Sequence, residues 1–202
     1  MRYLKMLGLA AVAAAGLMAF IGASTASATE LYSGATTLKT GTTFTPTVEG
    51  TWVWETTEGS VLNTCTSGSL KGKTTNNGSS TETVKANIEE LAFTSCTEGT
   101  ATLSKGGLEI HYTSGLNGTV TSINGSGGAA TEVTVNTTIF GSCVFVLPSG
   151  TTLGTLTGST TSNDVLDGNA VATRKSGLCP ATLKWTWTWT TTIPSPMHVT
   201  AS

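Results

Sequence analysis

The sequence predicts an all-β fold, either an antiparallel β-sandwich or a closed β-barrel, with two disulfides. Three observations support this prediction: apolar and polar side chains alternate, turn signals are frequent, and the chain has four cysteines. The alternation is clearest at residues 184–190, where Trp185, Trp187 and Trp189 alternate with lysine and threonine. Because successive side chains of a strand point to opposite faces, a two-residue period indicates a strand.

Other segments with the same period are also expected to be strands, at residues 51–55, 108–112 and 132–136. Turn signals rich in glycine and asparagine separate the strands, at residues 76–78, 105–107, 116–118, 124–128 and 167–169. Asn-Gly and Gly-Gly pairs accept the positive φ that tight hairpin turns require. A helical turn is expected nowhere except within Thr83 to Phe93, at Ile88-Glu89-Glu90-Leu91.

Residues 1–28 have the features of a cleavable signal peptide. A basic start with Arg2 and Lys5 precedes an uncharged apolar run from Met6 to Ile21, and Ala26-Ser27-Ala28 provides an A-x-A cleavage site. The apolar run, at about 16 residues, is shorter than the roughly 20 that span a bilayer as a helix. We therefore expect residues 29–202 to form one secreted, extracellular domain.

Composition restricts the partners of this domain. Loss of Arg2 and Lys5 with the signal peptide changes the formal net charge from −2 to −4. Because lysines and arginines do not cluster, nucleic acid is not an expected partner. No later apolar stretch is long enough to span a bilayer as a helix, so no membrane partner is expected after cleavage. Threonine makes up about a fifth of the chain, and this β-branched residue suits pleated strands.

The four cysteines of an exported chain indicate two disulfides. Metal binding is the rival explanation, but no C-x-x-C pair occurs, and His111 and His198 stand alone in the sequence. Four cysteines allow three pairings, between which the cysteine spacing alone does not decide. Sequence proximity favours Cys65–Cys96 and Cys143–Cys179.

A possible internal repeat favours the same pairing. The order cysteine, L-x-G-x-T-T, cysteine, A-T-L occurs twice. In the first copy the two motifs are Leu70–Thr75 and Ala101–Leu103, and in the second they are Leu156–Thr161 and Ala181–Leu183. If the halves are duplicates, each half would hold its own disulfide. No linker or charge run divides them, so we expect one domain.

Five segments of the sequence resemble those of a known group of proteins: residues 2–9, 32–38, 81–85, 153–158 and 194–198. In these segments the chain resembles small secreted proteins of unknown function from actinobacteria. The resemblance covers most of the chain and implies a bacterial exported protein. It implies no activity and no functional residue.

Catalytic and metal-binding motifs are weak. The chain has two histidines, two aspartates and no G-x-S-x-G segment, which disfavours a Ser-His-Asp hydrolase. A glycosidase needs two carboxylates, for which the candidates on or beside strands are Glu55, Glu58, Glu109 and Glu132. Calcium could be held by the oxygens of residues 163–169, although the D-x-D-x-D-G pattern is missing and an Asp-Gly turn explains the segment equally well. We expect no catalytic residue, metal or cofactor.

The tryptophans offer the most specific ligand-binding hypothesis. Trp185, Trp187 and Trp189 share one face of a strand and could form a platform on which sugar rings stack. The alternative is that this face is hydrophobic core, because aromatic side chains bury large areas and dominate core energetics. An exposed row of three indoles would be an apolar patch that soluble monomers avoid unless it is used. We therefore predict that the row points mainly into the core and its threonine face meets solvent.

The leading functional hypothesis is a non-enzymatic extracellular protein that binds a cell surface or glycan or acts structurally. A secreted polysaccharide hydrolase is the second hypothesis; a carboxylate pair in a cleft would support it, but the sequence shows no such pair. An outer-membrane β-barrel is the third, because such barrels alternate in the same way. Against it, the chain ends in Ala201-Ser202 rather than in an aromatic residue.

Overall fold

The computed structural model describes residues 29–45, 47–191 and 196–202, and within them the side chains of residues 47–49, 104–105 and 191 are not described. The predicted signal peptide, residues 1–28, lies outside the described residues. The described chain is all-β, as expected. Its elements are β1 (Glu30–Ser33), β2 (Thr36–Thr37), β3 (Thr43–Phe44), β4 (Thr47–Glu55), β5 (Val61–Thr74), β6 (Val84–Cys96), β7 (Thr100–Lys105), β8 (Gly107–Ser114), β9 (Asn117–Ile123), a 3-10 turn (Ser126–Gly128), β10 (Thr131–Thr137), β11 (Gly141–Leu147), β12 (Thr152–Thr157), β13 (Val165–Ser176), β14 (Thr182–Thr191) and β15 (Met197–Thr200).

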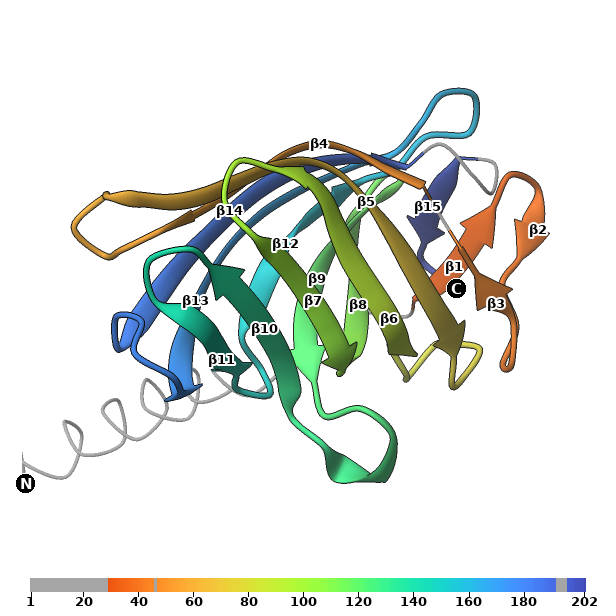
Figure 1. Ribbon diagram of the computed structural model, residues 1–202. Helices are drawn as coiled ribbons and strands as arrows, with labels where there is room; N and C mark the ends of the chain where they lie inside the picture. The colour runs from red at the N-terminus through yellow and green to blue at the C-terminus, as the bar shows by residue number, and fades with distance from the viewer. Residues whose placement is uncertain (1–28, 46, 192–195) are drawn as a thin grey trace, which may run out of the picture.

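Eight antiparallel strands close into a barrel, which decides between the sandwich and the barrel (Figure 1). Three of the eight consist of two elements each: β7–β8, β9–β10 and β11–β12. The pairing with β6 shows this, because Leu91 pairs with Leu103 of β7 and Asn87 pairs with Gly107 of β8 in one continuous register. Each strand pairs with its neighbour in sequence, and β14 pairs with β4 to close the ring.

A small sheet in the order β15-β1-β2, which we call the cap, lies at one end of the barrel (Figure 1). Leu31 and Val199 of the cap are buried. The amide of Val199 donates to the carbonyl of Leu116, 3.1 Å away, and the amide of Tyr112 donates to the hydroxyl of Thr29, 3.0 Å away. The cap thus joins the first described residues to the last ones and fastens both to the β8–β9 end of the barrel.

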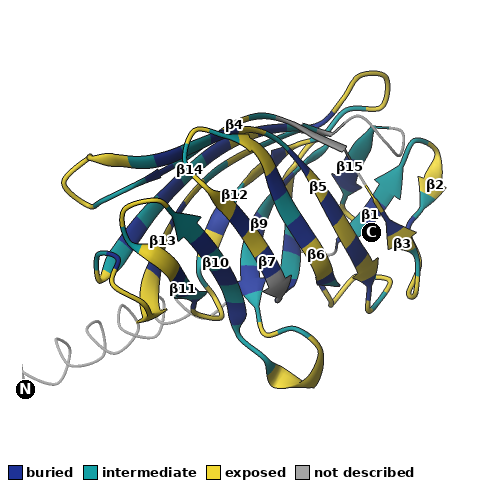
Figure 2. Ribbon diagram, in the orientation of Figure 1, coloured by how far each residue is buried: buried dark blue, intermediate teal, exposed yellow. Residues whose placement is uncertain are grey.

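The interior of the barrel is the hydrophobic core. Buried residues alternate with exposed ones along the strands, so that buried and exposed bands cross the sheet in Figure 2. On β14 the buried positions are leucine and tryptophan, and the intervening positions are lysine and threonine. The outer face is therefore rich in hydroxyl groups and the inner face is apolar. Among the described residues, no helix is long and apolar enough to cross a membrane.

The helical turn allowed within Thr83 to Phe93 is wrong, because this stretch belongs to strand β6. Lys71 of β5 pairs with Glu90, whereas the next residue, Gly72, pairs with Ile88. Glu89 is therefore the extra residue of a β-bulge, in which two residues of one strand oppose one of the other. The bulge exposes Glu89 and Glu90 and buries Ile88 and Leu91, which gives the sequence its helix-like spacing.

Two expected turns are also wrong. Gly106 does not end a hairpin; its φ of 152° marks a bend inside the continuous strand β7–β8. The Asp167-Gly168-Asn169 segment lies within β13, where Gly168 pairs with Trp187. A β-carbon built on Gly168 would lie 1.8 Å from the indole Cε2 of Trp187. The glycine is required there because the indole occupies the space of a side chain.

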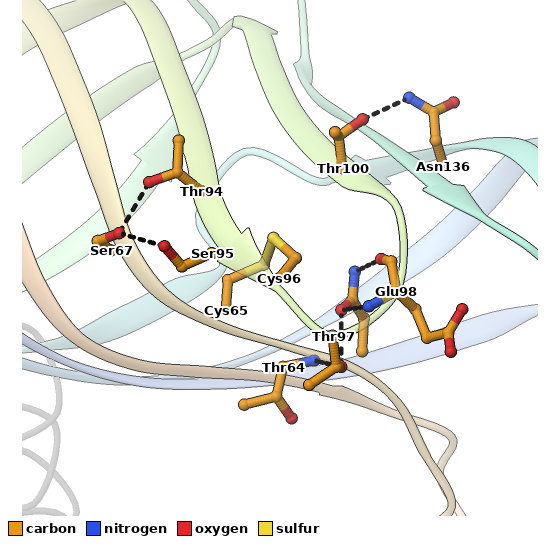
Figure 3. The surroundings of a disulfide bond; sticks show 11 residues. Thr64, Cys65, Ser67, Thr94, Ser95, Cys96, Thr97, Glu98, Thr100 and Asn136 are labelled. Carbon is orange, nitrogen blue, oxygen red and sulfur yellow. Dashed lines mark hydrogen bonds between the residues drawn. A yellow bond between two sulfur atoms is a disulfide. The ribbon is translucent and has the colours of Figure 1, made fainter.

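The two disulfides join Cys65 of β5 to Cys96 of β6, and Cys143 of β11 to Cys179 of the β13–β14 loop. These are the pairs that sequence proximity favours. Around the first, the hydroxyl of Ser67 lies 2.8 Å from that of Thr94, and the Thr64 amide donates to the Thr97 hydroxyl at 3.1 Å (Figure 3). Both disulfides lie at the end of the barrel opposite the cap, where they tie neighbouring strands and loops together.

Candidate functional site

The three tryptophans proposed as a ligand platform lie inside the barrel. Trp185, Trp187 and Trp189 are 3%, 7% and 6% exposed, respectively. The prediction that this row points into the core is therefore confirmed, and an exposed stacking platform is not present on β14. Burial follows from closure of the barrel, which gives the apolar face of β14 an interior in which to lie.

The buried indoles form one cluster with the tryptophans of β4. Cross-strand pairing places Trp54 beside Trp185 and Trp52 beside Trp187. Trp52 is central: its ring centroid lies 5.4, 5.7 and 4.2 Å from those of Trp185, Trp187 and Trp189. The first two separations are typical of favourable aromatic pairs and the third is slightly shorter, so the cluster stabilises the contact of β4 with β14 that closes the barrel.

The glutamates considered for glycoside hydrolysis are not brought together in one cleft. Glu55 accepts from Lys184 at 2.6 Å, and Glu132 forms an ion pair with Lys175. Glu109 lies 3.8 Å from the ammonium of Lys85 and 3.5 Å from the ring of His111. Three of the four thus each face a different cationic partner on the outer surface. The fourth, Glu58, lies in the β4–β5 turn, where hydrogen bonds from its own backbone amide, Thr56 and Thr57 lower its pKa.

The candidate calcium ligands do not converge either. Asp164 is fully buried, and its Oδ1 accepts the amide of Met197 of the cap at 3.1 Å. Asp167 and Asn169 are exposed on the outer face of β13. Among the described residues, no group of three or more His, Cys, Asp or Glu side chains could hold a metal ion.

The two histidines lie on different strands, β8 and β15, and the contacts of neither form a Ser-His-Asp triad. His111 lies on β8, with its Nε2 3.4 Å from the Thr121 hydroxyl. His198 is buried although it lies near the C-terminus, because β15 pairs with β1. Its ring stacks on Tyr32 with a centroid separation of 5.1 Å.

An open groove of about 580 Å³ lies on the outer face of β4, β14, β13 and β12. We call it the outer groove. Its lining residues come from all four strands, and most carry hydroxyl, carboxyl or amide groups: Thr51, Val53, Thr152, Gly154, Thr155, Asp167, Gly168, Asn169, Thr186, Trp187 and Thr188. Two of its glycines, Gly154 and Gly168, face each other across the ladder.

Register arranges the polar groups of the outer groove in two rows across the strands. Thr155, Asp167 and Thr188 are successive cross-strand neighbours and form one row. Asn169 and Thr186 form the other, which ends at Val53. Neighbouring strands are about 4.8 Å apart, so each row presents hydrogen-bonding groups at that spacing. Threonine hydroxyls and the asparagine amide both donate and accept, whereas the Asp167 carboxylate only accepts.

Sequence reasoning identified the threonine face of β14 as solvent-facing but missed the groove to which it belongs. Asp167 and Asn169 were assigned to a turn because Asp-Gly is a turn signal. The available clue was that Asp167, Asn169 and Val171 have the same two-residue period as the strands. The sequence does not show which strands lie beside β14, because that depends on how distant strands pair.

Comparison with known proteins does not extend this description: no protein-family model, no curated protein and no solved structure matches the chain.

Proposed function

We propose that the protein is a secreted, non-enzymatic extracellular protein that binds a glycan of a cell surface in the outer groove. The single observation that carries the proposal is the pair of polar rows, one on β12, β13 and β14 (Thr155, Asp167 and Thr188) and one on β13 and β14 (Asn169 and Thr186). A polysaccharide presents hydroxyl groups at regular intervals, each able to donate and to accept. Threonine, asparagine and aspartate side chains in register match such a ligand without requiring it to carry charge.

The side chains of these rows are free to bind. Apart from the backbone ladder, the side chains of Asp167, Asn169, Thr186 and Thr188 have no hydrogen bond or ion pair to any described residue. They also stand on a rigid scaffold, because β13 and β14 pair continuously from Val165 to Thr173. Polar groups held by regular strands lose little conformational freedom when a ligand binds, which favours affinity.

Binding is favoured over hydrolysis by the number of carboxylates. Asp167 is the one acidic residue among those that line the outer groove. Both retaining and inverting glycosidases need two carboxyl groups on either side of the scissile bond. The geometry therefore supports recognition of a glycan without its cleavage.

The distribution of apolar residues disfavours the outer-membrane alternative. Membrane-spanning barrels present an apolar band to lipid and a polar interior. Here the interior holds the tryptophan cluster and the exterior carries threonine, lysine and glutamate. The disulfides also suit an oxidising compartment, as expected for a secreted protein.

The test is an array of purified bacterial, plant and fungal polysaccharides probed with the mature protein. We expect binding to at least one polysaccharide, without release of reducing sugar. The double variant Asp167→Ala/Asn169→Ala should weaken that binding by about tenfold or more, because it removes several hydrogen bonds at once. Thr173→Ala, an exposed position of β13 outside the groove, is the matched control and should bind like the wild type.

Two results would overturn the proposal. The first is the absence of binding to any polysaccharide on the array, and the second is equal binding by the double variant and the wild type. Release of reducing sugar would instead support the hydrolase hypothesis. Since all of the substituted side chains are exposed, the free energy of unfolding should change by no more than about 0.5 kcal/mol per substitution.

A further inference from the structure

The five tryptophans place five hydrogen-bond donors in the interior of the barrel. Trp52, Trp54, Trp185, Trp187 and Trp189 are all buried. The Nε1 atom of each is inaccessible to solvent and has no hydrogen-bond partner in the structure. An indole N–H can only donate, and in folded proteins a buried one usually has an acceptor. The convergence of these donors needs a physical explanation.

No acceptor in the described part of the protein binds these indole N–H groups. The hydroxyl of Ser122 donates to that of Thr131 at 3.0 Å, and the Asn63 amide bonds with the backbone of Glu98. Asp164 accepts from Met197 near the cap. The other walls around the indoles are apolar: Phe93 packs against Trp52, Trp54 and Trp185, and leucine, isoleucine and valine side chains make up most of the rest. The tryptophan cluster is thus a group of donors in an apolar chamber.

Two adjoining cavities lie beside these indoles. One, of about 50 Å³, is lined by Trp52, Trp185, Trp187 and Trp189 together with leucines. The other, of about 60 Å³, extends toward the cap and is closed by Leu31 and Met197. They share five lining residues: Leu70, Leu108, Val120, Leu166 and Trp189. Trp189 therefore presents its indole at the boundary of both cavities.

We propose that the barrel interior is a second binding site, for a small uncharged molecule that is largely apolar and carries a hydrogen-bond acceptor. A cyclic ketone or ester is the chemical class that fits. Its hydrocarbon part would fill the leucine-lined volume, and its carbonyl oxygen would accept from the indole N–H groups. An anion is disfavoured, because no cationic residue lines either cavity and the Asp164 carboxyl lines the second one. The site does not depend on the outer groove or on glycan binding.

Nitrogen-15 NMR of the indole groups tests this proposal directly. The mature protein should be titrated with cyclohexanone and, in parallel, with methylenecyclohexane, which has nearly the same shape but no oxygen acceptor. We expect cyclohexanone to give a saturable downfield shift of at least one indole N–H proton and to raise the melting temperature. Methylenecyclohexane should give no such downfield shift.

Conservative variants identify the donor. Trp189→Phe keeps an aromatic ring and removes the N–H; it should weaken cyclohexanone binding by about fivefold to tenfold, the effect of one hydrogen bond. Trp54→Phe is the matched control, because Trp54 lines neither cavity, and its affinity should equal that of the wild type. If Trp189→Phe does not fold, as judged by circular dichroism, Trp185→Phe serves as the test.

Three results would overturn the proposal: no saturable shift with cyclohexanone, equal loss of affinity in the test and control variants, or indole protons that show exchange with bound water undisturbed by cyclohexanone. The last result would mean that water fills both cavities and satisfies the donors. Because the readout is confined to the barrel interior, these outcomes are separate from those of the polysaccharide array.

Discussion

Gly168 and Trp187 show how one pair of residues shapes both faces of the barrel wall. On the inner face, the indole of Trp187 occupies the space where a β-carbon at position 168 would stand. On the outer face, the same two residues belong to the lining of the outer groove. A packing requirement in the core therefore fixes a glycine beneath a surface that we propose to be functional.

Substitution of this glycine should destabilise the protein. A methyl group at Gly168 would lie 1.8 Å from Cε2 and 2.1 Å from Cζ2 of Trp187, so Gly168→Ala overpacks the core. We expect it to lower the free energy of unfolding by about 1–3 kcal/mol, measured by denaturant titration. In a Trp187→Phe background the same change should cost less, because the phenyl ring is smaller than the indole. Equal costs in the two backgrounds would contradict the contact.

At the scale of elements, the disulfides reinforce the end of the barrel that the cap does not cover. Cys143–Cys179 holds the β13–β14 loop against β11, where the Cys179 amide also donates to the Cys143 sulfur at 3.0 Å. Cys65–Cys96 is the equivalent link between β5 and β6. The two copies of each motif of the possible repeat begin four barrel strands apart: L-x-G-x-T-T within β5 and at the end of β12, and A-T-L within β7 and at the start of β14.

Loss of either disulfide should cost a large share of stability. The bonds close loops with sequence separations of 31 and 36 residues. By the chain-entropy estimate, Cys143→Ala/Cys179→Ala should lower the free energy of unfolding by about 3–4 kcal/mol, and Cys65→Ala/Cys96→Ala by a similar amount. Denaturant titration measures both changes. Peptide mapping of the non-reduced wild type, if it found Cys65 joined to Cys143 or Cys179, would refute the pairing.

The elements differ in how well the sequence predicted them. The Trp185 row was predictable as a buried strand, because alternating large aromatics and threonines leave one face that must be covered. The Ile88-Glu89-Glu90-Leu91 stretch was not, since a bulge imitates a helical period and depends on the partner strand. The sequence predicts a turn at Gly168, because the residue that requires a glycine there, Trp187, is distant in sequence. The outer groove could not be predicted either, because its lining residues come from strands that are distant in sequence.

At the scale of the whole molecule, the N-terminal end of the described chain is part of the fold. Thr29, which directly follows the predicted cleavage site, is fully buried and its amide donates to the Ser79 carbonyl at 3.2 Å. Its hydroxyl also accepts from Tyr112. The cap can therefore be completed by a chain that begins at residue 29.

Cleavage after Ala28 is the corresponding prediction. Expression of the full sequence in a bacterial host that secretes it should yield a mature protein beginning at Thr29, because Ala26-Ser27-Ala28 fits signal peptidase. Intact-mass measurement of the secreted protein decides the point. Ala26→Leu/Ala28→Leu, which removes the small side chains of the site, should block processing. A secreted species that retains residues 6–21 would rule out a cleaved signal.

The outer groove and the interior site both depend on a closed barrel that holds its tryptophans inside. Quenching of tryptophan fluorescence by iodide tests it most directly, because all five tryptophans are buried in the structure. Buried indoles should give blue-shifted emission and a quenching slope several-fold lower than that of the same protein unfolded in guanidinium. Emission typical of water-exposed indole, with a slope equal to that of the unfolded chain, would contradict it.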